Sequence, residues 1–181
     1  MRIVLIGMKG CGKTTLGTLL AEQLQLAFID SDSEIEKMHK LERREALSSR
    51  EIFKKYGEEY FNTLETRTLR HIAKEFGNTD FVFACGGRTP LQEENQEILA
   101  HLGNIIYLNI EKKVLLERYS ALGTPPFFPY QHDPERSLDE LLTQRVPVYK
   151  TLADITIDID EGPPEEVMTA IMTELKAYGT T

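Results

Sequence analysis

The fold of this chain is decided near its start, by the stretch Gly7-Met8-Lys9-Gly10-Cys11-Gly12-Lys13-Thr14. This stretch matches every fixed position of the pattern G-x-x-x-x-G-K-[ST], a loop that binds phosphate groups. It lies between an apolar segment at residues 2–6 and a segment at residues 14–24 that carries leucines at helical spacing. Because glycines between a strand and a helix let backbone N–H groups surround phosphates, the sequence predicts a nucleoside triphosphate site. A chance glycine-rich turn is the alternative.

The side chains that close this loop have separate expected roles. Lys13 would reach the β- and γ-phosphates and is the first expected catalytic residue, and the Thr14 hydroxyl would ligate Mg²⁺. ATP and Mg²⁺ are therefore the expected cofactors. The expected contacts of ATP with this region are Gly7, Gly10, Cys11, Gly12, Lys13, Thr14 and Thr15.

Length and composition narrow the class of protein. With 181 residues and a net charge of −8, the chain suits one domain spanning 1–181, and neither nucleic acid nor a membrane is an expected partner. Two cysteines give no disulfide framework and no signal peptide precedes the first strand, so we expect a cytoplasmic protein. The four histidines are widely separated, which favours surface positions over a zinc site. We expect a monomer, with a dimer as the alternative.

Apolar runs and helical spacings alternate along the chain. The expected strands are residues 2–6, 26–29, 81–85, 105–110 and 155–158. The expected helices are residues 14–24, 91–102, 112–119, 138–150 and 164–178, with one more that opens near Ser33 and a pair between 51 and 76 that meets at Gly57. This alternation predicts a parallel sheet with helices on both faces.

Two segments fall outside this regular alternation. Residues 33–76 hold the helix that opens near Ser33, a polar stretch over 37–50 and the helix pair after it, and we expect them to form a small substrate lobe. Residues 120–137 carry prolines beside Phe127 and Phe128 with no regular period. A long loop of this kind is usually functional, so we expect a mobile lid whose exposed phenylalanines pack only on closure.

Two acidic residues follow the second expected strand. Asp30 and Asp32 would point to the same side of an extended chain, into the crevice where parallel α/β sheets bind ligands. Beside a triphosphate, one carboxylate can hold Mg²⁺ while the other accepts a proton from an attacking hydroxyl. The alternative is structural, with Asp32 capping the next helix and Asp30 solvated.

The order and spacing of further motifs resemble the shikimate kinases, a family of P-loop enzymes, over nearly the whole chain. The matching pieces are the phosphate loop, Asp30-Ser31-Asp32, the segment 52–65, Gly86-Gly87, the helix with Arg118 and the stretch 144–149. The resemblance implies an α/β fold of three α/β/α layers, with a five-stranded parallel sheet of order 2-3-1-4-5. It also implies transfer of the γ-phosphate of ATP to a hydroxyl of shikimate or a related acidic polyol, a small-molecule acceptor on the route to aromatic amino acids.

The resemblance also implies roles for single residues. Asp32 would hold the acceptor hydroxyl and assist its deprotonation, and Asp30 would support Mg²⁺. Arg118 would pack on the adenine, and Arg145 would pair with the acceptor carboxylate; without the family, both could be exposed helix arginines. The expected contacts with the acceptor are Asp32, Asn62, Gly86, Gly87, Arg88 and Arg145.

The chain departs from the family around the acceptor and the lid. Asn62 stands where the family has an arginine for the acceptor carboxylate, Arg88 replaces a third glycine, and Pro125 replaces a lid arginine. Arg88 could restore the missing guanidinium from another direction. Similarly, Arg136 or Lys9 could replace the lid cation.

Two alternatives to a shikimate kinase follow from these departures. The segment between residues 36 and 52, within the expected lobe, is also longer than usual for the family. The chain could therefore be a kinase for a different small hydroxylated metabolite. It could also be a nucleotide-binding regulatory module with degenerate catalysis.

Overall fold

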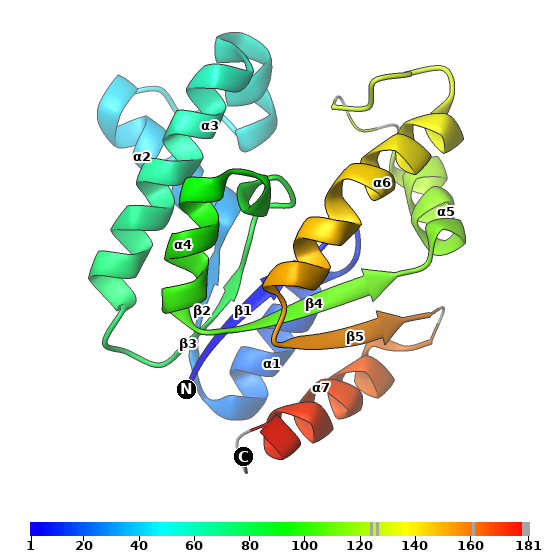
Figure 1. Cartoon of the computed structure of the whole chain (residues 1–181). Helices are drawn as coiled ribbons and strands as arrows, with labels where there is room; N and C mark the ends of the chain where they lie inside the picture. Colours follow the sequence, from blue (N-terminus) through cyan, green and yellow to red (C-terminus); the bar gives the residue numbers. More distant parts are fainter. Residues whose placement is uncertain (124, 126, 161, 179–181) are drawn as a thin grey trace.

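The computed structural model of the chain describes residues 1–123, 125, 127–160 and 162–178. Its centre is a parallel sheet of five strands in the order β2-β3-β1-β4-β5 (Figure 1). The strands are β1 (Arg2–Ile6), β2 (Ala27–Asp30), β3 (Phe81–Ala84), β4 (Asn104–Ile110) and β5 (Ile155–Ile159). The predicted fold class and strand order are confirmed. The apolar runs suit strands that are covered on both faces.

Helices cover the sheet on two sides and complete three layers (Figure 1). Helices α1 (Lys13–Leu24) and α7 (Pro164–Tyr178) contact each other below the sheet, and α4 (Glu93–Leu102) and α6 (Pro134–Leu152) lie on the opposite face. Residues 3–6 of β1 are fully buried between these layers. This burial anchors the end of β1, and the phosphate loop after it, in the close-packed centre of the sheet. Among the described helices, none is both long and apolar enough to cross a membrane.

A second, smaller apolar cluster lies within residues 33–76. Helices α2 (Ser31–Arg43) and α3 (Ser49–Phe76) pack together there. The buried residues of this cluster are Ile35, Ile52, Phe61 and Leu64. The predicted break at Gly57 is confirmed, since this residue has φ 81° and ψ 178° within α3. Because a side chain would be strained at that positive φ, glycine permits the bend.

Two predictions for this segment are wrong. Helix α2 begins at Ser31 rather than near Ser33, and it continues to Arg43 through residues expected as an irregular polar stretch. Few apolar side chains mark its buried face, so its helical period is weak in the sequence. His39 is fully buried instead of lying at the surface, because its Nδ1 shares a hydrogen bond of 2.9 Å with the Tyr60 hydroxyl.

The irregular loop within the expected lid is shorter than its sequence suggested. Helix α5 (Lys112–Leu122) and helix α6 enter it from both sides and leave residues 123–133 between them; Thr124 and Pro126 lie outside the described residues. Phe128 is already buried, with its ring 5.2 Å from that of Tyr119 in an edge-on contact. The expectation that Phe128 is exposed until the lid closes is therefore wrong, because Tyr119 of α5 already provides an apolar surface for the Phe128 ring.

Candidate active site

The phosphate loop has the backbone that its glycines predicted. Gly7, Gly10 and Gly12 have φ values of 142°, 82° and 101°, which residues with side chains rarely adopt. Space is also restricted at Gly7, where a Cβ atom would lie 2.8 Å from the carbonyl oxygen of Leu108. The loop thus turns sharply from β1 into the N-terminus of α1, which is the arrangement that binds phosphate.

The Lys13 side chain lies back across this loop. Its Nζ donates hydrogen bonds to the backbone oxygens of Gly7 at 2.9 Å and Met8 at 2.8 Å. The buried Cys11 Sγ lies 3.8 Å from the same nitrogen, and Thr15 is exposed in the first turn of α1. The ammonium is therefore held within the loop, where it can turn to a phosphate oxygen without a rearrangement of the backbone.

Helix α5 holds the phosphate loop from the outside. Arg118 Nη1 donates a hydrogen bond to the backbone oxygen of Gly10 at 2.7 Å, and the Tyr119 hydroxyl donates one to the backbone oxygen of Lys9. The predicted nucleotide residue Arg118 thus contacts the loop across 108 positions of sequence and is not an ordinary exposed arginine. Its packing on the adenine stays a prediction.

Asp30 connects the phosphate loop to α2. Its Oδ2 accepts a hydrogen bond from Thr14 Oγ1 at 2.9 Å, and its Oδ1 accepts one from the backbone N–H of Ser33 at 3.1 Å. The structure brings the two predicted metal ligands together. It also makes Asp30 the N-cap of α2, so the capping role considered for Asp32 is wrong.

Asp32 lies in the first turn of α2, and the expected alternation along an extended strand does not hold. The helix nevertheless keeps its carboxylate near Asp30 and near the cations Lys9 and Lys13 of the phosphate loop. Surrounding protein atoms displace water and raise the pKa of Asp32; Asp30 adds to this rise, and Lys9 and Lys13 oppose it. Because the side chain still reaches solvent, its carboxylate is accessible to an acceptor.

Two glycines after β3 form a close approach to this crevice. A Cβ atom at Gly86 would lie 2.6 Å from Thr89 Oγ1 and 2.8 Å from Glu65 Oε1. One at Gly87 would lie 3.3 Å from the backbone oxygen of Gly7. Gly87 therefore lies beside the phosphate loop and Gly86 beside Thr89 and Glu65, and a side chain at either position would fill the space there.

Sequence reasoning missed one acidic residue beside the crevice. Glu65 of α3 is only 4 % exposed, and its Oε1 accepts a hydrogen bond of 2.8 Å from Thr89 of the short helix η1 (Thr89–Leu91). Burial raises the pKa of Glu65 to about 7, although Thr89 and Arg88 lower it. Its Oε2 has no hydrogen-bond partner among the described residues. The available signal was a carboxylate among the apolar positions of α3.

Arg145 of α6 is the most buried cation near the site. Its exposed fraction is 3 %, and its burial lowers the pKa of the guanidinium. The ring of Phe127 lies 5.4 Å from its guanidinium carbon. No carboxylate within the described part of the chain forms an ion pair with it. A buried guanidinium without an anionic partner fits the predicted binding of a carboxylate.

Arg88 and Asn62 lie between the end of β3 and the lobe. Arg88 forms an ion pair with Glu58 of α3, and its guanidinium carbon lies 5.6 Å from the centre of the Phe53 ring. The buried Oδ1 of Asn62 has no hydrogen-bond partner in the part of the chain that the structure describes. Arg88 therefore points toward the lobe and is not an ordinary surface residue.

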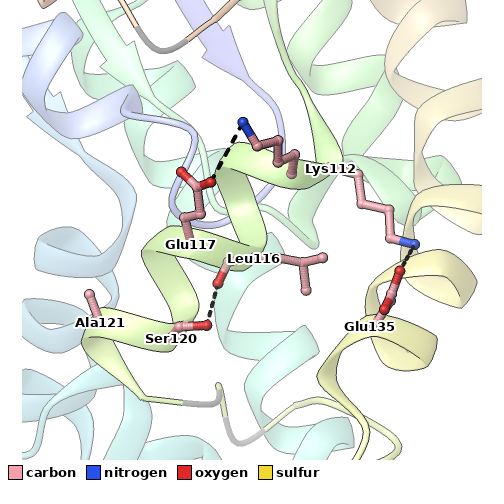
Figure 2. A pocket seen from close by; sticks show the side chains of 7 residues that line it. Lys112, Leu116, Glu117, Ser120, Ala121 and Glu135 are labelled. Carbon is pink, nitrogen blue, oxygen red and sulfur yellow. Dashed lines mark hydrogen bonds and ion pairs between the residues drawn. The ribbon is translucent and has the colours of Figure 1, made fainter.

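A pocket of about 630 Å³ lies elsewhere, between α5 and the start of α6 (Figure 2). It is lined by Lys112, Lys113, Leu116, Glu117, Ser120, Ala121 and Glu135. Its charges pair with one another, Lys112 with Glu135 at 3.0 Å and Lys113 with Glu117 at 3.8 Å. None of the predicted site residues lines it, so we do not assign it to the active site.

A phosphate loop between β1 and α1 of a parallel sheet in this strand order defines a P-loop phosphotransferase fold. Comparison with known proteins narrows this class. A family model described as shikimate kinase matches residues 9–176. The chain belongs to the shikimate kinase family, and thereby to the phosphotransferases that use an alcohol group as acceptor.

Relatives of known name cover nearly the full chain. A shikimate kinase of Caldanaerobacter subterraneus subsp. tengcongensis is 38% identical over 176 residues, 97% of this chain and 95% of that protein. One of Pseudomonas savastanoi pv. phaseolicola is 35% identical over 173 residues, 96% of this chain and 95% of that protein. The structure of a shikimate kinase from Acinetobacter baumannii in complex with shikimate has a TM-score of 0.85 at 33% identity, covering 97% of this chain and 93% of that one.

Proposed function

We propose that this chain transfers the γ-phosphate of ATP to a hydroxyl group of shikimate. The observation that carries the proposal is the meeting of Lys13, the Thr14–Asp30 pair and Asp32 at one edge of the sheet. The buried Arg145 guanidinium nearby fits an acceptor that bears a carboxylate. Further support comes from the family and from the Acinetobacter baumannii relative, which was solved with shikimate.

Thr14 and Asp30 are the residues that would hold Mg²⁺. Within the described residues, no group of three or more His, Cys, Asp or Glu side chains could hold a metal ion. A hydroxyl and one carboxylate are instead the usual protein share of a Mg²⁺ site completed by nucleotide phosphates and water. Bound there, Mg²⁺ would neutralise part of the phosphate charge. The loop residues from Gly7 to Thr15 would surround the phosphates, and Arg118 would contact the adenine.

Asp32 would take the proton of the acceptor hydroxyl. The hydroxyl oxygen then forms its bond to the γ-phosphorus, and the bond between that phosphorus and the bridging oxygen of ADP breaks. The Lys13 ammonium would stabilise the negative charge that develops on the phosphate oxygens. The raised pKa of Asp32 supports this role, because a carboxylate of higher pKa is a stronger base.

Acceptor binding would involve the lobe and the lid. We assign residues 33–76 to a substrate lobe and residues 120–137 to a lid, in a single domain. Gly86, Gly87 and Asn62 would line the acceptor site with Arg145. Lys9 is the better replacement for the missing lid cation, because its charge acts on Asp32, whereas Arg136 stacks on Tyr130 at 4.0 Å.

We also propose a cytoplasmic monomer. Cys11 and Cys85 are both free and buried, which is in keeping with a reducing compartment. Among the described residues, the exposed large apolar side chains are only Met1, Leu41 and Tyr178, on separate elements of the chain. They form no large apolar patch of the kind that stable interfaces bury.

The test is release of ADP by the purified chain, coupled to a spectrophotometric assay, with Mg²⁺-ATP and with shikimate present or absent. We expect release that depends on shikimate and on Mg²⁺. A panel of other hydroxylated acids and sugars serves as the comparison. Release that depends on another acceptor of this panel would redirect the function, and ATP binding without transfer to any of them would indicate a regulatory module.

A further inference from the structure

Three charged groups converge behind the acceptor side of the crevice. The positive charge of Arg88 lowers the pKa of Arg145 and also lowers that of Glu65, so all three side chains lie within electrostatic reach of one another. Arg88 comes from the loop after β3, Arg145 from α6 and Glu65 from α3. Two guanidinium groups that approach one another repel, and Glu65 offsets this only in part because burial raises its pKa to about 7, so a further anion near both arginines favours the arrangement.

The helix α3 locates Arg88 with respect to Asn62. Arg88 forms an ion pair with Glu58 and lowers the pKa of Glu65. On α3, Glu58 lies four residues before Asn62 and Glu65 lies three residues after it. Positions separated by three or four residues share one face of a helix. The guanidinium of Arg88 therefore lies over the face of α3 on which Asn62 is found.

Unused hydrogen-bonding groups gather at the same place. Arg88 Nε and Arg145 Nε are buried donors without a partner among the described residues, and Asn62 Oδ1 and Glu65 Oε2 are buried acceptors in the same condition. Buried polar atoms without partners are rare in proteins, because each costs free energy. Donors on two arginines suit a carboxylate, and acceptors beside them suit the hydroxyls of the same molecule.

We propose that Arg88 supplies the second guanidinium that binds the acceptor carboxylate together with Arg145, and that this carboxylate displaces Glu58 from Arg88. The inference deepens the proposed function and rests on it. Glu58 is a partner that can be replaced, since its side chain is 61 % exposed and returns to water at little cost. The Arg88 side chain is 25 % exposed, so its own charge remains more shielded from water and gains more from a new partner.

The test compares two acceptors that differ by one charge, shikimate and its methyl ester, in the wild type and in Arg88→Ala. With shikimate, we expect Arg88→Ala to raise the KM of the acceptor at least tenfold, with the KM of ATP changed less than twofold. With the uncharged ester, the same substitution should change the KM less than threefold. An equal rise for both acceptors would overturn the proposal, because a structural role of Arg88 does not depend on the acceptor charge.

Three further variants separate charge, fork geometry and position. Arg88→Lys should recover part of the affinity for shikimate, because it keeps the charge but not the two parallel hydrogen bonds of a guanidinium. Asn62→Arg added to Arg88→Gly should recover most of it, since it returns a guanidinium to the same face of α3. Arg70→Ala is the matched control: Arg70 lies on α3 and pairs with the exposed carboxylate Glu94, as Arg88 pairs with Glu58, so we expect unchanged kinetics.

Glu58→Gln tests the exchange of partners. If Glu58 competes with the acceptor carboxylate, this variant should lower the KM of shikimate about twofold to fivefold. A raised KM would contradict the exchange. Failure of this inference is distinct from failure of the proposed function: a wild type active on shikimate, with Arg88→Ala unchanged, refutes only the inference, whereas a wild type without shikimate-dependent ADP release refutes the function itself.

Discussion

The nucleotide half and the acceptor half of this site differ in whether their polar atoms already have hydrogen-bond partners within the protein. In the nucleotide half, the side chains of Lys13, Thr14 and Arg118 already make hydrogen bonds within the protein. In the acceptor half, four buried polar atoms lack partners within the described residues. The phosphate loop of the nucleotide half is one continuous stretch of chain around its glycines, and Arg118 of α5 contacts it from outside. The atoms of the acceptor half come from three separate elements, α3, the loop after β3 and α6, and we expect a ligand to complete their interactions.

The largest expected effect concerns Lys13. Lys13→Ala should lower kcat/KM by a factor on the order of 10³ or more, because the loop loses the charge that acts on the phosphates. The thermal midpoint should change little, since the hydrogen bonds of Lys13 Nζ go to groups of the loop itself, the backbone oxygens of Gly7 and Met8 and the Cys11 Sγ. Steady-state kinetics and thermal unfolding measure both. Near wild-type turnover would show that the nucleotide site lies elsewhere, and the comparison of the two halves would then fail.

The two carboxylates at the border of the halves should respond differently. Asp32→Asn should lower kcat by a factor on the order of 10² to 10⁴ with little change in the KM of ATP, because it removes the proton acceptor. Asp30→Asn should weaken Mg²⁺ binding instead. Titration of the rate with Mg²⁺ separates the two variants, and rescue of both by excess Mg²⁺ would show that the roles are assigned wrongly.

Glu65 should make the stability of the free protein depend on pH. Its pKa rises from 4.5 when unfolded to about 7 when folded, so the folded state binds more protons between these pH values and the free energy of unfolding falls as pH rises through them. The loss is at most about 3 kcal/mol. Urea unfolding at pH 5 and pH 8 should show a smaller difference for Glu65→Gln than for the wild type. An unchanged difference would mean that Glu65 is charged throughout.

The smallest expected effect concerns Arg118. Arg118→Ala should raise the KM of ATP roughly threefold to tenfold, since one hydrogen bond to the phosphate loop and one surface for the base are lost. The KM of shikimate should stay the same. A larger change in the KM of shikimate than in the KM of ATP would contradict the assignment of Arg118 to the nucleotide half. Kinetics at saturating levels of the other substrate measure each constant.

How much of the site the sequence predicts also follows this division. The phosphate loop could be predicted residue by residue, because its glycines and Lys13 act through local backbone geometry. Asp30 and Asp32 were predicted near the site, but with both on an extended chain, because Asp30, Ser31, Asp32 and Ser33 are all of residue types that cap helices and the pattern does not show which one starts α2. Glu65 was missed, since its burial depends on contacts with Thr89 that no local pattern encodes.

The fold divides in a similar way. The strands were predicted well, because a short run of apolar and often β-branched residues is typical of a buried strand in a domain of this size. Helix α2 and the burial of His39 were not, because both depend on packing against α3. The loop within the lid was expected too long, since prolines mark the start of α6 as readily as they mark a loop.

The two oxygens of the Asp30 carboxylate connect the start of α1 mechanically to the start of α2. One oxygen faces Thr14 in the first turn of α1, and the other fixes the first turn of α2, on which Asp32 is carried. Any change at the first oxygen rotates or shifts a carboxylate whose second oxygen sets the direction of α2. A change at bound phosphates would therefore be transmitted, through this single planar group, to the position of Asp32, the proposed base.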